Sequence, residues 1–213
     1  AVSSGSDDLA YNDFLLTGMI ALAVAQGGMF GMADLVEMRR KGLLKRLRMT
    51  PARMGLYGLA DIAVRILYGV VQVLALSLIG VIFFGATLHV NFPTLAAAFL
   101  VGALAFSALG YLISAFSKTM EAYMGIANIV SFLMMFLSGI FFPVETMPTW
   151  LQPLSNVLPL TYFVEALRDG MVYAAGIASA DLWIGCGVMA LWGIIAYALG
   201  SWLYKSKAIA AAR

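Results

Sequence analysis

Long apolar stretches alternate with short polar segments along this chain. Five stretches each hold about 20 mostly apolar residues, the length that a helix needs to cross the hydrocarbon core of a bilayer. They cover Phe14–Ala33, Leu59–Phe84, Thr94–Ser117, Ala122–Phe142 and Leu182–Tyr204. Apolar residues run through them without the strict alternation of barrel strands, so the pattern predicts helices. We expect an all-α fold: a polytopic helical bundle forming a single transmembrane domain over residues 1–213.

The composition agrees with lipid as the solvent for much of the surface. Hydrophobic residues occupy 62% of the 213 positions and charged residues only 11%, whereas a soluble domain carries about 25% charged residues. A net charge of +2 does not indicate a nucleic-acid partner. One cysteine and one histidine argue against a multi-cysteine or histidine-built metal site, and we expect neither a metal nor catalytic residues in this chain.

Charge asymmetry predicts the orientation. Basic residues follow the first, third and fifth spans, and alternating spans bring these three places to one side of the membrane, which the positive-inside rule makes cytoplasmic. They are Arg39, Arg40, Lys41, Lys45, Arg46, Arg48, Arg53, Lys118, Lys205, Lys207 and Arg213. Residues 1–13 then lie outside the cell and the C-terminus inside. The expected location is the cell membrane of a bacterium or archaeon.

The polar N-terminal segment has no features of a signal peptide, because it lacks a basic start and an apolar stretch before a cleavage site. An outside N-terminus without a signal peptide predicts that a further span precedes this sequence. We therefore expect a parent protein with six spans.

The most charged part of the chain is residues 34–58, here called the elbow. Leu35, Met38, Leu44 and Leu47 fall on one helical face, and Thr50-Pro51 is typical of a helix start. The pattern predicts two short helices with a break near residues 49–50. The elbow can lie on anionic lipid as a basic amphipathic helix, or it can dock a cytoplasmic partner.

Residues 143–181 form a proline-rich region on the opposite side, here called the outer hairpin. Thr149–Val157 and Leu160–Asp169 are apolar but too short to cross a bilayer, which is typical of re-entrant or interfacial helices. A plain amphipathic surface loop is the alternative.

Two sequence motifs resemble those of a known family. Glu37-Met38-Arg39-Arg40-Lys41-Gly42 followed by a leucine-rich stretch ending in Thr50-Pro51 resembles the cytoplasmic motif of type-2 ABC exporter permeases. Ser138-Gly139-Ile140-Phe141-Phe142-Pro143, with Met147-Pro148, Pro159, Thr161-Tyr162 and Arg168, resembles the outer hairpin of that family. Leu43 departs from the family pattern, which often has threonine there.

The resemblance implies six spans, a coupling elbow and a re-entrant outer hairpin. It also implies a separate ABC ATPase subunit that binds ATP and Mg²⁺, with no cofactor bound by this chain. The implied coupling residues are Glu37, Arg39, Arg40, Gly42, Lys45, Arg46, Thr50 and Pro51, and those of the hairpin are Gly139, Phe142, Pro143, Met147, Pro148, Pro159, Thr161, Tyr162 and Arg168. The working unit would pair two permeases, as a homodimer or with a sister permease. The chain contains no Gly-x-x-x-x-Gly-Lys-Ser/Thr phosphate loop of its own.

Few polar residues lie inside the spans. Asn128 and Ser131 can hydrogen-bond between helices or, with Met135, line a translocation path. Asp61 and Arg65 can pair with each other, one turn apart. Gly27 and Gly31 form a small-xxx-small pair that favours close helix packing, and a dimer seam is one place for it.

The apolar interior favours an amphipathic drug, lipid or lipid-linked cargo. An autonomous secondary transporter or a membrane scaffold that transports nothing are the alternative functions.

Overall fold

The computed structural model of the chain describes residues 4–42, 54–86, 89–141, 144–173 and 179–210. All regular secondary structure within these ranges is helical, as the sequence predicts. The long helices are α1 (Ser4–Phe30), α4 (Met54–Phe84), α5 (Phe92–Phe116), α6 (Met120–Leu137) and α9 (Ala180–Ala210). The short ones are α2 (Ala33–Arg40), η1 (Val144–Thr146), α7 (Gln152–Ser155) and α8 (Pro159–Met171). Five helices are long and apolar enough to cross a membrane, which confirms the five predicted spans.

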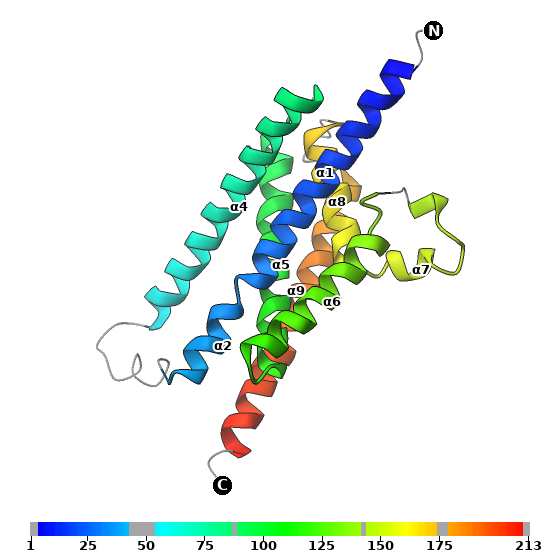
Figure 1. Ribbon diagram of the computed structural model, residues 1–213. Helices are drawn as coiled ribbons and strands as arrows, with labels where there is room; N and C mark the ends of the chain where they lie inside the picture. Colours follow the sequence, from blue (N-terminus) through cyan, green and yellow to red (C-terminus); the bar gives the residue numbers. More distant parts are fainter. Residues whose placement is uncertain (1–3, 43–53, 87–88, 142–143, 174–178, 211–213) are drawn as a thin grey trace.

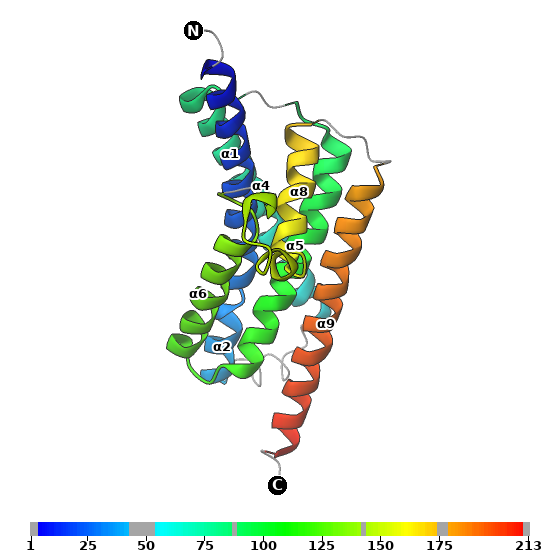
Figure 2. The ribbon, with the colours of Figure 1, turned by 90° about the vertical axis from the view of Figure 1, so that its right-hand side faces the viewer.

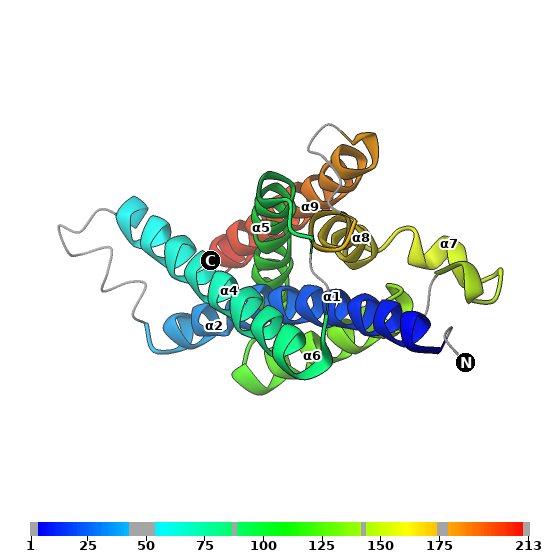
Figure 3. The same cartoon turned by 90° about the horizontal axis from the view of Figure 1, so that it is seen from above.

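Helix α5 forms the centre of the bundle. It packs against α9, α1 and α8, and the view from above in Figure 3 shows it between them. Half of its apolar stretch is buried inside the protein, compared with 17% of the stretch in α4. The rings of Phe106 on α5 and Phe163 on α8 lie 5.5 Å apart in the buried core. Helix α4 is peripheral and packs mainly on α1 (Figure 1).

Local sequence signals determine where two of the spans begin. The Asn91 side chain accepts a hydrogen bond from the backbone N–H of Thr94 at 3.4 Å, with a proline in the first turn of α5. The Thr119 hydroxyl accepts one from the backbone N–H of Ala122 at 3.2 Å at the start of α6. Both are ordinary N-caps, which satisfy backbone donors that a helix cannot satisfy itself.

The α1–α2 junction interrupts an otherwise continuous helical path at Gly31 and Met32. Helix α5 approaches this junction closely, since a Cβ at Gly110 would lie 3.0 Å from the Cα of Met29. The buried Tyr123 hydroxyl, on α6, donates a hydrogen bond to the backbone carbonyl of Met29. The break therefore lies where three helices meet. The Met29 carbonyl accepts from the backbone N–H of Met32 at 3.2 Å as well as from Tyr123, so α6 contacts the junction directly.

The outer hairpin folds back into the bundle. Helix α6 ends short of the end of the bundle where the N-terminus lies, and α8 rises from there to that end (Figures 1 and 2). Nine of the residues of α8 are buried, among them Leu160, Phe163 and Leu167. A helix buried against α5, α9 and α1 is not a surface loop, so the structure favours the re-entrant arrangement over the alternative.

The basic segments gather at one end of the bundle, as predicted from alternating spans. Helix α2, the turn between α5 and α6 that holds Lys118, and the C-terminal part of α9 all lie at the end shown lowest in Figures 1 and 2. Glu165, Asp169 and Asp181 belong to α8 and the start of α9, toward the opposite end.

Candidate functional site

The described part of the elbow is α2 and the turn that follows it. Its last turn carries Arg39 and Arg40, and Arg40 is exposed. Glu37 and Lys41 form an exposed ion pair one helical turn apart, with 2.5 Å between Oε1 and Nζ. Gly42 has a φ of +69°, a left-handed conformation that favours glycine after a helix end. Thus α2 presents an exposed charged surface and ends in a tight turn.

The elbow breaks earlier than the sequence predicts. Helix α2 ends at Arg40 and the chain turns at Lys41–Gly42, because left-handed Gly42 cannot continue a right-handed helix. The apolar face through Leu44 and Leu47, the predicted break at residues 49–50, and Lys45, Arg46, Thr50 and Pro51 lie outside the described residues.

Arg39 joins the elbow to two other helices. Its guanidinium donates a hydrogen bond to the backbone carbonyl of Ser117, the C-cap residue of α5. The same group lies 5.4 Å from the centre of the Tyr204 ring on α9, within range of a cation–π contact. A cation at the end of α5 also interacts favourably with the negative end of the helix dipole. Arg39 therefore links α2, α5 and α9.

Tyr204 continues this link into the bundle. Its hydroxyl and that of Ser114 on α5 are 2.7 Å apart, and its ring lies 5.1 Å from the ring of Tyr111. Tyr111 also stacks on Tyr197 at 5.5 Å. The sequence gives no sign of these contacts, because the partners of Tyr204 and Tyr111 are distant along the chain and no local pattern marks them.

Arg168 organises the opposite end of the bundle in a similar way. Its guanidinium donates to the carbonyl of Gly139 at 3.0 Å and to that of Phe14 at 3.4 Å. The guanidinium carbon also lies 3.5 Å from the centre of the Phe14 ring. Arg168 of α8 thus holds the end of α6 to α1, and the resemblance that pointed to Arg168 gave no indication of Phe14.

Gly139 and Ile140 explain part of the hairpin motif. Gly139 has a φ of +69°, which turns the chain directly after α6. Ile140 is fully buried, and a Cβ at Gly18 of α1 would lie 2.9 Å from its side chain. The glycine at position 18 therefore leaves the space that Ile140 fills. Phe142 and Pro143 lie outside the described residues.

Side-chain donors hold the hairpin to backbone carbonyls. Thr161 donates to Ser155 at 2.7 Å, Tyr162 to Asn156 at 2.8 Å, and Trp192 of α9 to Val157 at 2.9 Å. The Ser155 hydroxyl donates to the carbonyl of Leu137. Pro159 begins α8 at a position where a helix tolerates proline. Met147 and Pro148 lie in the segment between η1 and α7.

A cavity of about 360 Å³ opens beside Arg168, with Glu165, Asp169, Phe14 and Tyr173 among its lining residues. Burial raises the pKa of Asp169, and the neighbouring carboxylate of Asp181 raises it further. This cavity lies at the end of the bundle opposite the elbow.

The three candidate path residues share one side of α6 but differ in exposure. Asn128 is exposed and donates to the carbonyl of Met124 in its own helix at 2.8 Å. Ser131 is buried, with no hydrogen-bond partner for its hydroxyl among the described residues, and Met135 is partly buried. No helix in the described part of the chain covers Asn128.

These features define a class: a helical, multi-pass membrane protein with a basic elbow at one end and a re-entrant hairpin at the other. The family model described as ABC-2 type transporter matches residues 3–172, and the chain belongs to this family of membrane transport components.

Relatives of known description agree with this assignment. The chain is 27% identical over 192 residues to ABC transporter G family member 20 of Dictyostelium discoideum, covering 88% of this chain and 26% of that protein. It is 25% identical over 207 residues to Nodulation protein J of Rhizobium meliloti, covering 94% of this chain and 76% of that protein. A match to Nodulation protein J of Rhizobium leguminosarum is 26% identical and covers 49% of this chain and 39% of that protein. The chain thus spans about a quarter of the first relative and under half of the last.

Proposed function

We propose that this chain is the membrane-spanning permease subunit of an ABC exporter. The exporter moves its cargo out of the cell, driven by ATP hydrolysis on a separate nucleotide-binding subunit. Membership of the ABC-2 transporter family supports a role in transport. The observation that carries the coupling is the double contact of Arg39 with the Ser117 carbonyl and the Tyr204 ring. A force on the elbow reaches α5 and α9 through one side chain.

The position of α5 determines how such a force spreads. Because α5 packs on α1, α8 and α9, a displacement at its Ser117 end shifts the packing of the whole bundle. Close-packed helices respond by moving between discrete arrangements. ATP would favour one arrangement by holding the partner ATPase in the form that pushes on α2. ATP and Mg²⁺ belong to that partner in this scheme.

A second permease copy, identical or a sister chain, completes the path. Asn128 is exposed on α6 beside exposed Ile129 and Phe132. An amide facing lipid is unfavourable because hydrocarbon offers it no hydrogen bonds. Covering this face with the second copy removes Asn128 from lipid and places Asn128, Ser131 and Met135 near the seam between the copies.

The cargo class follows from the same face. Apart from Asn128, its exposed side chains are mainly apolar, including Ile129, Phe132 and Phe136. Such a surface suits an amphipathic drug, a lipid or a lipid-linked molecule, whose apolar part it can contact without unpaired polar groups.

Orientation in the membrane has its own test. We place the elbow in the cytoplasm of a bacterial or archaeal cell and the α8 end outside. In intact cells an impermeant maleimide should label Tyr173→Cys and spare Lys205→Cys, both at exposed positions. The reverse labelling would invert the proposed transport direction relative to the elbow.

The decisive experiment purifies the tagged full-length protein from its native membrane and measures ATP-dependent transport in vesicles. We expect a stoichiometric ATPase, and loss of transport with retained ATP hydrolysis in Arg39→Gln. Transport driven by an ion gradient without an ATPase would favour a secondary transporter. A stable bundle with neither activity would favour a scaffold.

A further inference from the structure

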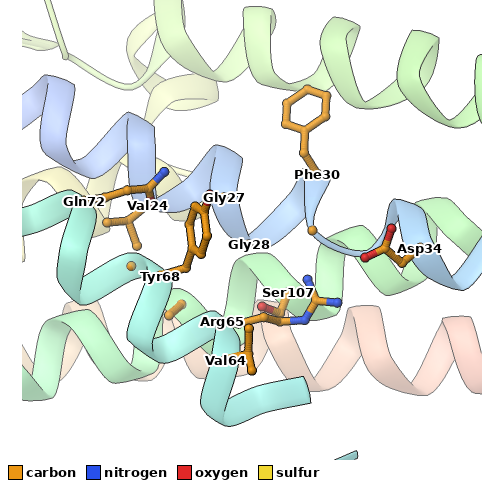
Figure 4. A pocket seen from close by; sticks show the side chains of 13 residues that line it. Val24, Gly27, Gly28, Phe30, Asp34, Val64, Arg65, Tyr68, Gln72 and Ser107 are labelled. Atoms are coloured by element: carbon orange, nitrogen blue, oxygen red, sulfur yellow. The ribbon is translucent and has the colours of Figure 1, made fainter. Parts of the chain in front are cut away.

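Two cavities of about 360 Å³ differ in how far their polar side chains are already engaged. In the groove between α1 and α4, which Figure 4 shows, two long side chains of α4 lie against the glycines of α1. A Cβ at Gly27 would lie 3.0 Å from the Gln72 carboxamide, and a Cβ at Gly31 would overlap the Arg65 guanidinium. The small-xxx-small pair therefore packs against α4 of the same chain, whose side chains fill the space above it.

The cavity beside Arg168, at the end of the bundle opposite the elbow, is different. Ser138 lines it, at the C-cap of α6, and is only 1% exposed. The Ser138 hydroxyl has no hydrogen-bond partner among the described residues. A buried polar group without a partner is unfavourable, so a ligand that hydrogen-bonds to this hydroxyl gains binding free energy.

Asp169 provides a second polar group in the wall of this cavity. It lies on α8 and is partly buried, and no hydrogen bond or ion pair engages its carboxylate within the described part of the chain. Burial raises the pKa of Asp169, and the like charge of Asp181 raises it further. Both effects disfavour the ionised carboxylate, and a cation held against it would oppose both.

The charges around the cavity also favour a cation. Two carboxylates, of Glu165 and Asp169, line it with one guanidinium, that of Arg168. The guanidinium is directed to the Phe14 ring and to the backbone carbonyls of Phe14 and Gly139. Glu165 is exposed, and a carboxylate that faces hydrocarbon is unfavourable, so we expect the cavity to open toward water.

The lining determines which kind of cation fits. No group of three potential metal ligands occurs among the described residues, which argues against a metal ion. A primary ammonium has three N–H donors and can serve a carboxylate and a hydroxyl at the same time. Val144 and the Tyr173 ring offer contact to an apolar body attached to it. The volume is within the range of small-molecule sites in proteins.

We propose that this cavity binds an organic cation through a primary ammonium group. The ammonium donates to the Asp169 carboxylate and the Ser138 hydroxyl, and the apolar body of the ligand lies against Val144 and Tyr173. This inference does not rest on the proposed ATP-driven export, because it concerns equilibrium binding at the end of the bundle away from the elbow.

The test is fluorine NMR of 4-(trifluoromethyl)benzylamine, titrated with the full-length protein in phosphatidylcholine nanodiscs. Empty nanodiscs correct for partition into lipid. We expect saturable binding of the amine and at least about tenfold weaker binding of 4-(trifluoromethyl)benzyl alcohol, which has the same body but no charge. Equal affinity for the amine and the alcohol would overturn the proposal.

Variants test the two polar groups separately. Asp169→Asn should weaken amine binding about tenfold and leave the alcohol unaffected, and it should fold because burial already disfavours the charge. Glu121→Gln removes an exposed acid at the elbow end of the bundle and should change nothing. Ser138→Ala should weaken amine binding about threefold, through loss of one hydrogen bond. Equal amine affinity in Asp169→Asn and Glu121→Gln would contradict the site.

A lipid headgroup and a soluble amine both offer a primary ammonium. Nanodiscs that also contain phosphatidylethanolamine distinguish these sources. We expect the amine affinity to stay unchanged, since a cavity that opens toward water receives its ligand from solution. Competition by phosphatidylethanolamine that Asp169→Asn abolishes would assign the same ammonium site to the lipid.

Discussion

The guanidinium carbon of Arg168 on α8 lies 3.5 Å from the centre of the Phe14 ring on α1. The two residues are separated by most of the chain, and the same guanidinium also reaches the Gly139 carbonyl at the end of α6. One side chain therefore joins the re-entrant helix to two spans.

Replacing Arg168 with methionine should destabilise the protein by about 2–3 kcal/mol, because a partly buried cation–π contact and hydrogen bonds from a charged donor are lost together. Thermal unfolding in detergent measures the effect. Arg168→Lys should recover only part of it, since an ammonium cannot reproduce the planar fork. A double-mutant cycle with Phe14→Leu should show a coupling of about 1 kcal/mol, and a coupling near zero would show that the ring contact adds nothing.

Gly139→Ala should cost about 1–2 kcal/mol, because alanine at a φ of +69° is strained. Gly187→Ala is the matched control: it lies within α9, has no positive φ, and a Cβ there meets no atom within 4 Å. That control should be neutral or slightly stabilising, since alanine favours helix over glycine. If both variants behaved alike, the left-handed turn after α6 would not be a constraint.

Gly110→Ala tests the contact between α5 and α1. Its Cβ would meet backbone atoms of Met29, and backbone cannot rotate away as a side chain can. We expect a loss of about 1–3 kcal/mol, typical of overpacking. Unfolding in detergent, compared with the same Gly187→Ala control, provides the measurement, and an unchanged midpoint would contradict the close approach.

Tyr204→Phe should separate two contacts of one residue. The ring beneath Arg39 remains, but the hydrogen bond with Ser114 is lost, for a cost of about 1 kcal/mol. If the ring carries the link to the elbow, Tyr204→Phe should keep the ratio of transport to ATP hydrolysis, whereas Tyr204→Ala should lower it. Equal ratios in the two variants would remove the ring from the coupling path.

Asp169 should make stability depend on pH. Burial and Asp181 raise its pKa in the folded protein, so the folded state binds this proton more tightly than the unfolded chain does. The stabilisation that Asp169 contributes is fully present below the ordinary carboxyl pKa. It is lost as the pH rises through the raised pKa of Asp169 in the folded protein. Asp169→Asn should flatten this part of a stability profile measured in detergent, and an unchanged profile would show that another group is responsible.

Span positions were predictable because hydrocarbon thickness sets helix length and leaves a long apolar signal. The outcome for Gly27 and Gly31 was not, because a glycine pair indicates close approach without naming the partner, which proved to be Gln72 and Arg65. The end of α2 at Arg40 was missed for a local reason. The spacing of apolar residues typical of a helix continues past Gly42, but the helical backbone conformation ends before it, because Gly42 is left-handed. The side chain of Asp61 lies outside the described residues, so its predicted pairing with Arg65 stays a prediction.

The hydrogen bonds from Arg39, Arg168, Thr161, Tyr162 and Trp192 share one property: each ends on a main-chain carbonyl. Every residue type supplies that acceptor, so mutation at Ser117, Asn156 or Val157 leaves it in place. The residues that donate from a side chain should therefore tolerate few substitutions, whereas the residues that accept through the main-chain carbonyl should tolerate many. A saturation mutagenesis scan should find this asymmetry at each pair. Correlated substitution, the usual trace of spatial contact, should be faint at the contacts that hold the elbow and the hairpin.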